Sequence, residues 1–141
     1  MPVETRLIAS LQRKIKPVEK IVSIRGATQA NEDSIKGIKN AVCELLKEII
    51  KQNKIDVGKI VNIMFTVTGD LTSIHPAKVA REELELKLVP MLCMQEMRVP
   101  DDLPRCIRVM VQTYSDVSKE KIKHVYLKEA ENLRPDLTYE F

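Results

Sequence analysis

The stretch that decides the fold is the run Arg105-Cys106-Ile107-Arg108-Val109-Met110-Val111-Gln112-Thr113-Tyr114. Successive side chains of a β-strand point to opposite faces. A strand here has one face made of Ile107, Val109, Val111 and Thr113 and another made of Cys106, Arg108, Met110, Gln112 and Tyr114. The first face belongs in a core, whereas the second holds a charge in mid-strand, which is costly to bury unless it is paired or used. Arg108 therefore indicates a functional site, or a structural ion pair at a subunit interface.

A second charge, Glu96, lies in the run Cys93-Met94-Gln95-Glu96-Met97, twelve residues before Arg108. A third, Arg25, ends a predicted strand just before Gly26, a position that also suits a solvated loop residue. Glu96 follows Cys93 by three residues, so both can line one site only if the strand ends or bulges between them. The three charges predict a site for an anionic small molecule, with Glu96 as the partner of Arg108.

The rest of the chain alternates strand and helix signals. We expect strands over 21–25, 60–67, 88–97, 105–114 and 124–130, helices over 34–53 and from 76 to about 86, and a short helical turn over 118–122. Asp33 or Ser34 is expected to cap the first helix. Pro76 suits the first turn of the second helix, and Pro90 indicates an edge strand or a strand start. The loop of about seven residues after residue 97 favours an antiparallel hairpin between the third and fourth strands.

This order predicts an α+β fold, a mixed five-stranded β-sheet packed by two main helices. Two helices can cover only one face of such a sheet. The other face would carry Met, Val and Arg side chains, so it predicts a symmetric homo-oligomer.

The composition limits the class of protein. Of 141 residues, 44% are hydrophobic and 4% aromatic, and Trp is absent, which predicts one domain with an aliphatic core. A net charge of +3 does not favour nucleic acid, and no apolar run approaches the ~20 residues of a membrane span. Three cysteines in apolar segments predict free thiols in a reducing compartment, the cytoplasm. Residues 1–20 are read as a basic N-terminal extension, flexible or a short helix, with organellar targeting as an alternative; residues 21–141 form the domain.

Other candidate residues have ordinary alternatives. Lys78 and Arg81 share a helix face, which is also typical of solvated charge. Tyr126 is expected on a strand face with His124 and Lys128, and Arg134 precedes Pro135 in what otherwise reads as a surface loop. Neither histidine has a Cys or Asp partner at metal or catalytic spacing, and there is no phosphate loop or nucleophile–base pair. Together the candidates comprise several cations, one carboxylate, one thiol and one phenol. This set suits the binding of a small dicarboxylate and catalysis by positioning and electrostatics, without metal or cofactor.

Five motifs, in order and with similar spacing over roughly residues 22–137, resemble the monofunctional AroH-class chorismate mutases. They are Ile24-Arg25-Gly26-Ala27-Thr28, Pro76-Ala77-Lys78 with Arg81-Glu82, Cys93-Met94-Gln95-Glu96-Met97, Cys106-Ile107-Arg108-Val109-Met110, and His124-Val125-Tyr126-Leu127 with Leu133-Arg134-Pro135-Asp136-Leu137. The resemblance implies a trimeric pseudo-α/β barrel with active sites at subunit interfaces. It also implies the Claisen rearrangement of chorismate to prephenate, in phenylalanine and tyrosine biosynthesis, without a cofactor.

The resemblance also implies roles. Arg108 would contact the ether oxygen of the substrate, Arg25 would hold the enolpyruvyl carboxylate with help from Tyr126, and Glu96 would accept from the ring hydroxyl, with Cys93 nearby. The pocket would be lined by Ala77, Lys78, Arg81, Met91 and Leu92 and covered by Leu133 and Arg134. Two positions depart from the pattern: His75 stands where a Phe is expected, and Leu92 where some members carry Thr.

Two other functions remain open on the sequence. One is a trimer of similar architecture that binds a small molecule or deaminates enamines, resembling the RutC group; the combination of Arg25, Glu96 and Arg108 argues against it. The other is a lyase that releases pyruvate from chorismate.

Overall fold

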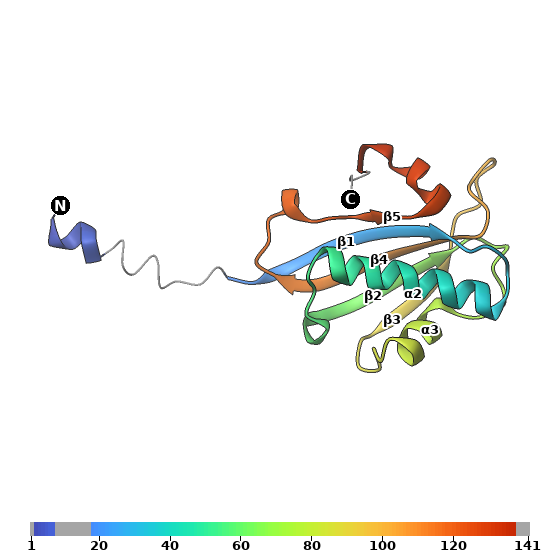
Figure 1. Ribbon diagram of the computed structural model, residues 1–141, viewed down its shortest axis with the longest axis horizontal. Helices are drawn as coiled ribbons and strands as arrows, with labels where there is room; N and C mark the ends of the chain where they lie inside the picture. The colour runs from blue at the N-terminus through green and yellow to red at the C-terminus, as the bar shows by residue number, and fades with distance from the viewer. Residues whose placement is uncertain (1, 8–17, 138–141) are drawn as a thin grey trace.

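The computed structural model describes residues 2–7 and 18–137. The strands are β1 (Lys20–Gln29), β2 (Ile60–Val67), β3 (Met91–Gln95), β4 (Cys106–Ser115) and β5 (Val125–Tyr126). The helices are α2 (Ile35–Gln52) and α3 (Pro76–Glu83), with 3-10 turns η1 (Val57–Lys59), η2 (Lys119–Lys121), η3 (Lys128–Leu133) and η4 (Pro135–Leu137) (Figure 1). Of the predicted N-terminal extension, residues 3–7 are helical, and residues 8–17 lie outside the described part.

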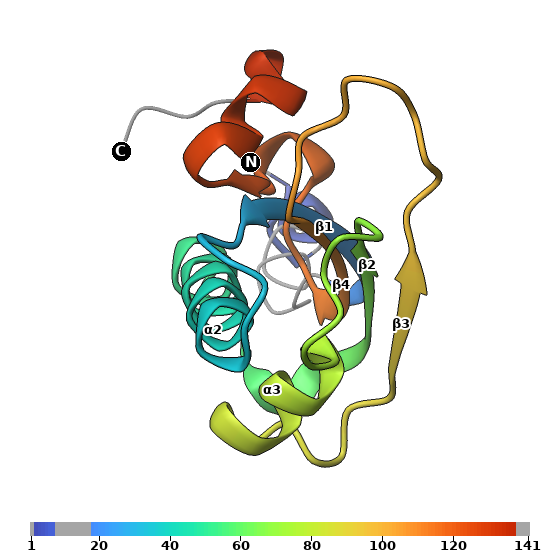
Figure 2. The same ribbon diagram turned by 90° about the vertical axis from the view of Figure 1, so that its right-hand side faces the viewer.

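The five strands form one sheet in the order β3-β2-β4-β1-β5. Strand β4 pairs antiparallel with β1 and with β2, whereas β1–β5 and β2–β3 are parallel pairs, so the sheet is mixed, as predicted. Figure 2 shows α2 along one side of the sheet and α3 near its β3 end, while no helix of the described residues covers the opposite side of β4. The core lies between the sheet and α2, where Ile107, Val109 and Val111 of β4 are buried, as the alternation predicted.

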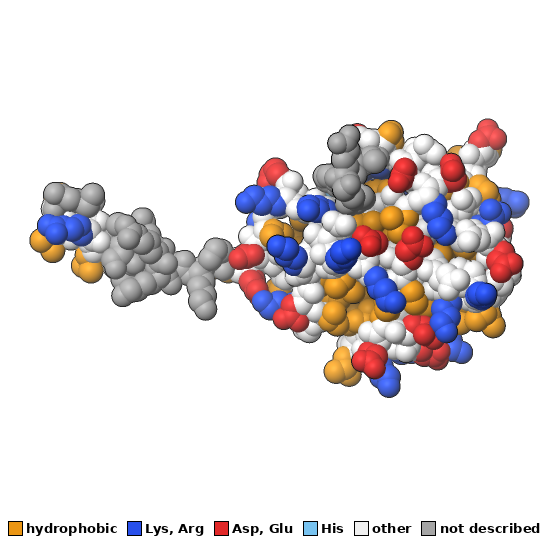
Figure 3. Space-filling view, in the orientation of Figure 1, with side chains coloured by type: hydrophobic (Ala, Val, Ile, Leu, Met, Phe, Trp, Pro, Cys, Tyr) orange, Lys and Arg blue, Asp and Glu red, His pale blue; other side chains and the backbone are white. Residues whose placement is uncertain are grey.

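Helix α2 begins where the sequence predicts. The Ser34 hydroxyl accepts a hydrogen bond from the Gly37 amide at 2.9 Å, so Ser34 is the N-cap. Residues at three- and four-residue spacing form the buried stripe: Ile38, Val42, Leu45, Leu46 and Ile49. On the face that carries this helix, basic and acidic side chains are intermixed (Figure 3). Within the described residues, no helix has both the length and the apolar character needed to cross a membrane.

The predicted hairpin between the third and fourth strands is wrong. Strand β3 pairs only with β2, in parallel, and β2 lies between β3 and β4. The reason is that β2, α3 and β3 form a strand–helix–strand unit, which brings two parallel strands together. The loop after β3 then passes the end of β2 to reach β4. Pro90 immediately precedes β3 at the sheet edge, as predicted.

The first and last strands also differ from the prediction. Strand β1 continues past Gly26 to Gln29, because Gly26 is a close-packing position rather than a strand end: a Cβ there would lie 2.8 Å from Ile49 Cδ1 and 2.9 Å from the Val125 carbonyl oxygen. Strand β5 has only two residues, because the backbone of Lys128 turns at φ 54 into η3. Lys128 therefore does not share a strand face with Tyr126.

Asp33 ties the start of α2 to the loop that leads into α3. Its carboxylate accepts from the amides of Thr72 and Ser73 at 3.0 and 3.1 Å and from both hydroxyls at 2.8 Å. These hydrogen bonds, led by that from the Thr72 amide, lower the pKa of Asp33 from 3.8 to about 2. The ionised carboxylate therefore contributes stability above pH 3.8, and this contribution is lost as the pH falls through about 2.

Asp33→Asn is expected to lower the melting temperature at neutral pH, because an amide is a weaker acceptor and cannot take all four bonds. The difference from wild type should shrink on acidification from pH 3.8 towards 2, where Asp33 becomes protonated. Thermal melts of wild type and Asp33→Asn across this pH range measure the difference in melting temperature. Thr72→Ala, which keeps the carboxylate and removes one hydroxyl donor, should lower the melting temperature less. A wild-type–variant difference that stays constant with pH would contradict the assignment.

Candidate active site

Four of the predicted site residues meet at one cavity on the sheet face that lacks a helix. The cavity has a volume of about 310 Å³ and is lined by Arg25, Gly26, Met64, Thr66, Met94, Glu96, Arg108, Val109, Met110 and Tyr126. All five strands contribute to this lining, and Glu96 is the residue directly after β3. The sheet therefore supplies the floor, and the charged side chains rise from it.

Strand register explains why Arg108 and Glu96 meet. Thr66 of β2 is paired with Arg108 of β4 on one side and with Met94 of β3 on the other. Glu96 follows the end of β3, and its amide continues the parallel ladder by donating to the Val67 carbonyl at 2.8 Å. Since Met94 and Glu96 are two residues apart, their side chains point to the same face as Arg108.

The Arg108–Glu96 contact is an ion pair that leaves donor capacity on the guanidinium. Arg108 Nε lies 3.1 Å from Glu96 Oε1, and the two side chains are 34% and 23% exposed. The Nε atom is buried and makes no aligned hydrogen bond despite this distance, whereas the Thr66 hydroxyl donates to the same Oε1 atom. A guanidinium has five N–H donors. Glu96 is thus oriented mainly by Thr66, and Arg108 keeps donors for a ligand.

Arg25 and Tyr126 lie on the same face. Ala27 of β1 is paired with Arg108 on β4 and with Tyr126 on β5, and Arg25 is two residues away along β1. Tyr126 is only 7% exposed and packs with Ala27, Ala130 and the partly buried Leu103 and Leu133. The packing holds the phenol at the cavity wall on β5, next to β1 and one strand further from β4.

The charges at this cavity favour an anion. Arg25 and Arg108 line the cavity with one carboxylate, Glu96. Arg134 is close enough to Tyr126 to interact with it electrostatically, and it is bound to both carboxylate oxygens of Asp136 at 3.0 and 2.8 Å. Cys106, on the same strand face as Arg108, is buried. Burial raises the pKa of its thiol more than the charge of Arg108 lowers it. The cavity thus carries an excess of positive charge in its first ring of side chains.

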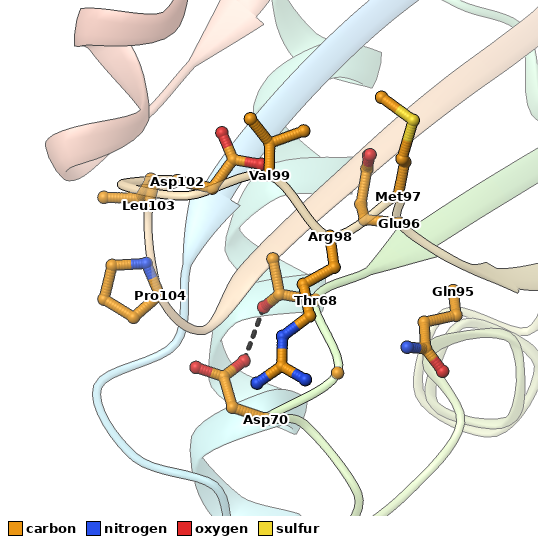
Figure 4. A pocket seen from close by; sticks show the side chains of 11 residues that line it. Thr68, Asp70, Gln95, Glu96, Met97, Arg98, Val99, Asp102, Leu103 and Pro104 are labelled. Atoms are coloured by element: carbon orange, nitrogen blue, oxygen red, sulfur yellow. Dashed lines mark hydrogen bonds between the residues drawn. The ribbon is translucent and has the colours of Figure 1, made fainter.

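A larger neighbouring hollow of about 410 Å³ lies between the ends of β2 and β3 and the loop before β4. Figure 4 shows Arg98 directed towards Asp70, with Glu96 and Asp102 on other sides of the hollow. Three carboxylates and one arginine therefore line this hollow. Asp70 is also committed to the fold, because it accepts from the Arg105 amide at 2.9 Å and from the Thr68 hydroxyl at 2.5 Å. This hollow is less suited to a dicarboxylate than the smaller cavity.

The other predicted site residues do not line this cavity. Cys93 points to the other face of β3, where its Sγ accepts from the Ala77 amide at 3.4 Å; burial raises the pKa of its thiol. It lines a separate hollow with His75 and Pro76. We call the residues on α3 and β3 the edge group: Ala77, Lys78, Arg81, Met91, Leu92 and Cys93. The arginine group comprises Arg25, Glu96, Arg108 and Tyr126, with Leu133 and Arg134 beside it. One chain does not bring the two groups together.

Two contacts of the arginine group were not expected from the sequence. The Thr66 hydroxyl reaches Glu96, and His124 Nδ1 accepts a hydrogen bond from the Arg25 amide at 2.9 Å. A polar residue inside the apolar run 60–67 was the available signal for Thr66, whereas nothing local pointed to His124. Within residues 2–7 and 18–137, no three His, Cys, Asp or Glu residues are grouped as metal ligands would be.

The chain is similar to known proteins along most of its length. The family model for chorismate mutase type I matches residues 21–137. The chain is 41% identical over 118 residues to the chorismate mutase AroH of Bacillus subtilis, covering 84% of this chain and 93% of the relative. It is 43% identical over 115 residues to AroH of Thermus thermophilus, covering 81% and 93%. A solved chorismate mutase from Clostridium thermocellum superposes with a TM-score of 0.76 at 39% identity, over 79% of this chain and 98% of that one.

The mixed sheet with its helices, and the excess of positive charge at the cavity, fit an enzyme domain of the class that acts on small anions. The chain belongs to the chorismate mutase type I family, and the resemblance seen in its motifs is confirmed. It is a chorismate mutase, an isomerase that acts in aromatic amino-acid biosynthesis.

Proposed function

We propose that this enzyme rearranges chorismate to prephenate at the arginine group, by restricting the substrate and stabilising its transition state electrostatically. The observation that supports this most is the placement of Arg25, Glu96, Arg108 and Tyr126 around one cavity. Arg25, with Tyr126, binds the enolpyruvyl carboxylate. Glu96 accepts a hydrogen bond from the ring hydroxyl. Arg108 donates to the ether oxygen, where negative charge grows as the carbon–oxygen bond breaks.

The rearrangement requires no catalytic group besides these four side chains. In a Claisen rearrangement a carbon–carbon bond forms while the ether bond breaks, and no proton is transferred. The enzyme must hold a flexible dianion in the reactive shape and place donors where charge develops. An acceleration of ~10⁶ corresponds to about 8 kcal/mol. Fixed cations and restriction of the substrate are able to supply that amount together.

We further propose a homotrimer of pseudo-α/β-barrel type, in which the edge group of one protomer faces the arginine group of the next. Two features support it: the groups are separated in one chain, and large apolar side chains at the sheet edge are exposed, with Leu92 at 64%, Met94 at 43% and Met97 at 78%. Leu133 and Arg134 then cover the bound substrate. His75 and Leu92 make the α3–β3 wall of that site. The domain is taken as residues 21–141, and the free thiols of Cys43, Cys93 and Cys106 fit a cytoplasmic enzyme.

The direct test of function is the loss of chorismate absorbance with purified protein and no added cofactor. Product identification separates the alternatives. Prephenate supports the proposal, whereas pyruvate release would mean a lyase, and an unchanged spectrum would favour a binding protein.

The turnover number should depend only weakly on pH between about 6 and 9 and should not fall in the presence of a chelator. The rearrangement moves no proton, so a bell-shaped profile of general acid–base catalysis is not expected, and arginine side chains stay charged over this range. Burial raises the pKa of the Cys93 thiol, which keeps it protonated in most of the range. The measurement is kcat against pH with and without EDTA. A steep bell centred near neutrality in the chemical step, or loss of activity with EDTA, would mean different chemistry.

A further inference from the structure

His124 makes a specific hydrogen bond at the cavity rim. Its Nδ1 atom accepts from the backbone amide of Arg25 at 2.9 Å, across a sequence separation of 99 residues. The bond lies directly before the parallel pairing of β1 with β5, which begins at Gly26–Val125 and continues at Ala27–Tyr126. His124 therefore stands where the strand that carries Arg25 first meets the strand that carries Tyr126.

The segment that holds His124 is itself fixed. Asn53, the C-cap of α2, donates to the Lys123 carbonyl at 2.8 Å and accepts from the Lys123 amide at 2.9 Å. On the other side, the Leu127 amide donates to the Ala27 carbonyl at 2.9 Å. These bonds fix the backbone on both sides of His124, whose side chain is half-buried. Its bond to Arg25 is thus a constraint on β1.

We propose that His124 is a positioning residue: as a neutral imidazole protonated on Nε2, it fixes the Arg25 backbone and thereby aims the Arg25 guanidinium at the substrate carboxylate. This rests on the role proposed above for Arg25. His124 does not line the cavity and is not assigned a contact with substrate. It acts through Arg25.

The surroundings favour the required protonation state. The pKa of His124 is lowered from 6.5, first by burial and then by the cations Arg25 of β1 and Arg134 after η3. The contact from α2 comes through the uncharged Asn53 and reaches Lys123. A second proton would turn Nδ1 into a donor that faces the Arg25 amide, itself a donor, so the bond would be lost. Substrate binding should therefore weaken as the pH falls below 6.5, while turnover near neutrality is unaffected.

The test uses two replacements at one position. The side-chain oxygen of an asparagine can take the place of Nδ1, whereas a leucine has no acceptor. His124→Leu should raise the KM for chorismate about tenfold, as expected for one lost hydrogen bond, with kcat changed much less. The KM of His124→Asn should stay close to that of wild type at neutral pH, and it should not rise at acid pH. His75→Gln removes the other histidine of the chain; whatever its KM at neutral pH, that KM should still rise at acid pH.

A double-mutant cycle separates positioning from general damage. In an Arg25→Ala background, His124→Leu should raise KM no further, because the side chain that it aims is gone. A KM unchanged in His124→Leu, or an effect of equal size in both backgrounds, would overturn the proposal. If Arg25→Ala alone leaves KM unchanged, the role of Arg25 fails, and the positioning proposal is overturned with it.

Nuclear magnetic resonance of the histidine ring nitrogens gives a readout that does not depend on activity. With two histidines in the chain, His75→Gln assigns the signals. We expect His124 to be protonated on Nε2 and to titrate below 6.5. Protonation on Nδ1 of the neutral ring would overturn the proposal even if His124→Leu failed to fold.

Discussion

Arg108→Ala is expected to lower kcat by about 10³-fold, the cost of removing a preorganised donor from a site of developing negative charge. Arg108 lies 3.1 Å from Glu96 at one cavity with Arg25, so the variant loses the cation assigned to the ether oxygen. The fold should persist, because Glu96 keeps its bond from Thr66 and Arg108 is 34% exposed. The measurement is steady-state turnover of chorismate, with circular dichroism as the check on folding.

Two further variants sharpen this result. Arg108→Lys should recover little activity, because an ammonium group lacks the planar fork that reaches the carboxylate and the substrate together. Arg98→Ala is the matched control: it removes an arginine from the neighbouring hollow, which three carboxylates also line, and should leave turnover near wild type. Near-normal turnover in Arg108→Ala would refute the mechanism.

Two inactive variants should restore activity to each other when they are mixed in one trimer. Arg108→Ala disables the arginine group, and Lys78→Ala with Arg81→Ala disables the edge group. If each site takes one group from each of two neighbouring protomers, random mixing leaves about a quarter of the sites with both groups intact. Co-expressed or co-refolded mixtures should therefore show about that fraction of wild-type turnover, from parents that show almost none.

The control mixture is Arg108→Ala with Glu96→Ala, both in the arginine group, which should give no recovery because every site lacks one of the two. Sedimentation should give about three times the chain mass of 16.1 kDa for all of these proteins. Failure of the first mixture to recover in demonstrated trimers would place both groups of a site on one protomer. A fully active monomer would contradict the assembly altogether.

Local sequence patterns were sufficient to predict most of the helices and strands. The apolar positions of residues 34–53 predicted α2, with a cap at Asp33 or Ser34, of which the structure has Ser34. The alternation over residues 105–114 predicted which face of β4 is buried. Both signals depend on the spacing of neighbouring residues, which is set by helix and strand geometry alone. The family was also readable in this way, because its motifs are short and lie in order.

Strand pairing was decided only by the tertiary structure. A short loop after β3 suggested a hairpin, yet β2 lies between β3 and β4, because α3 carries the chain back to form a parallel pair with β2. That same pairing puts Thr66 between Arg108 and Glu96. Loop length constrains reach but not strand order. Strand order depends on which faces of the strands and helices become buried together, and that is a property of the whole chain.

The sequence by itself indicated Arg25, Glu96 and Arg108 as candidate site residues, through their charge in or beside apolar segments. Only the tertiary structure decided how they divide: Arg25, Glu96, Arg108 and Tyr126 share one cavity, whereas Cys93 faces α3 on the other side of β3. It also decided the bond from the Arg25 amide to His124, which joins residues 99 positions apart. Periodicity assigns a residue to a face, but contacts between distant segments depend on strand register and packing, which no local pattern contains.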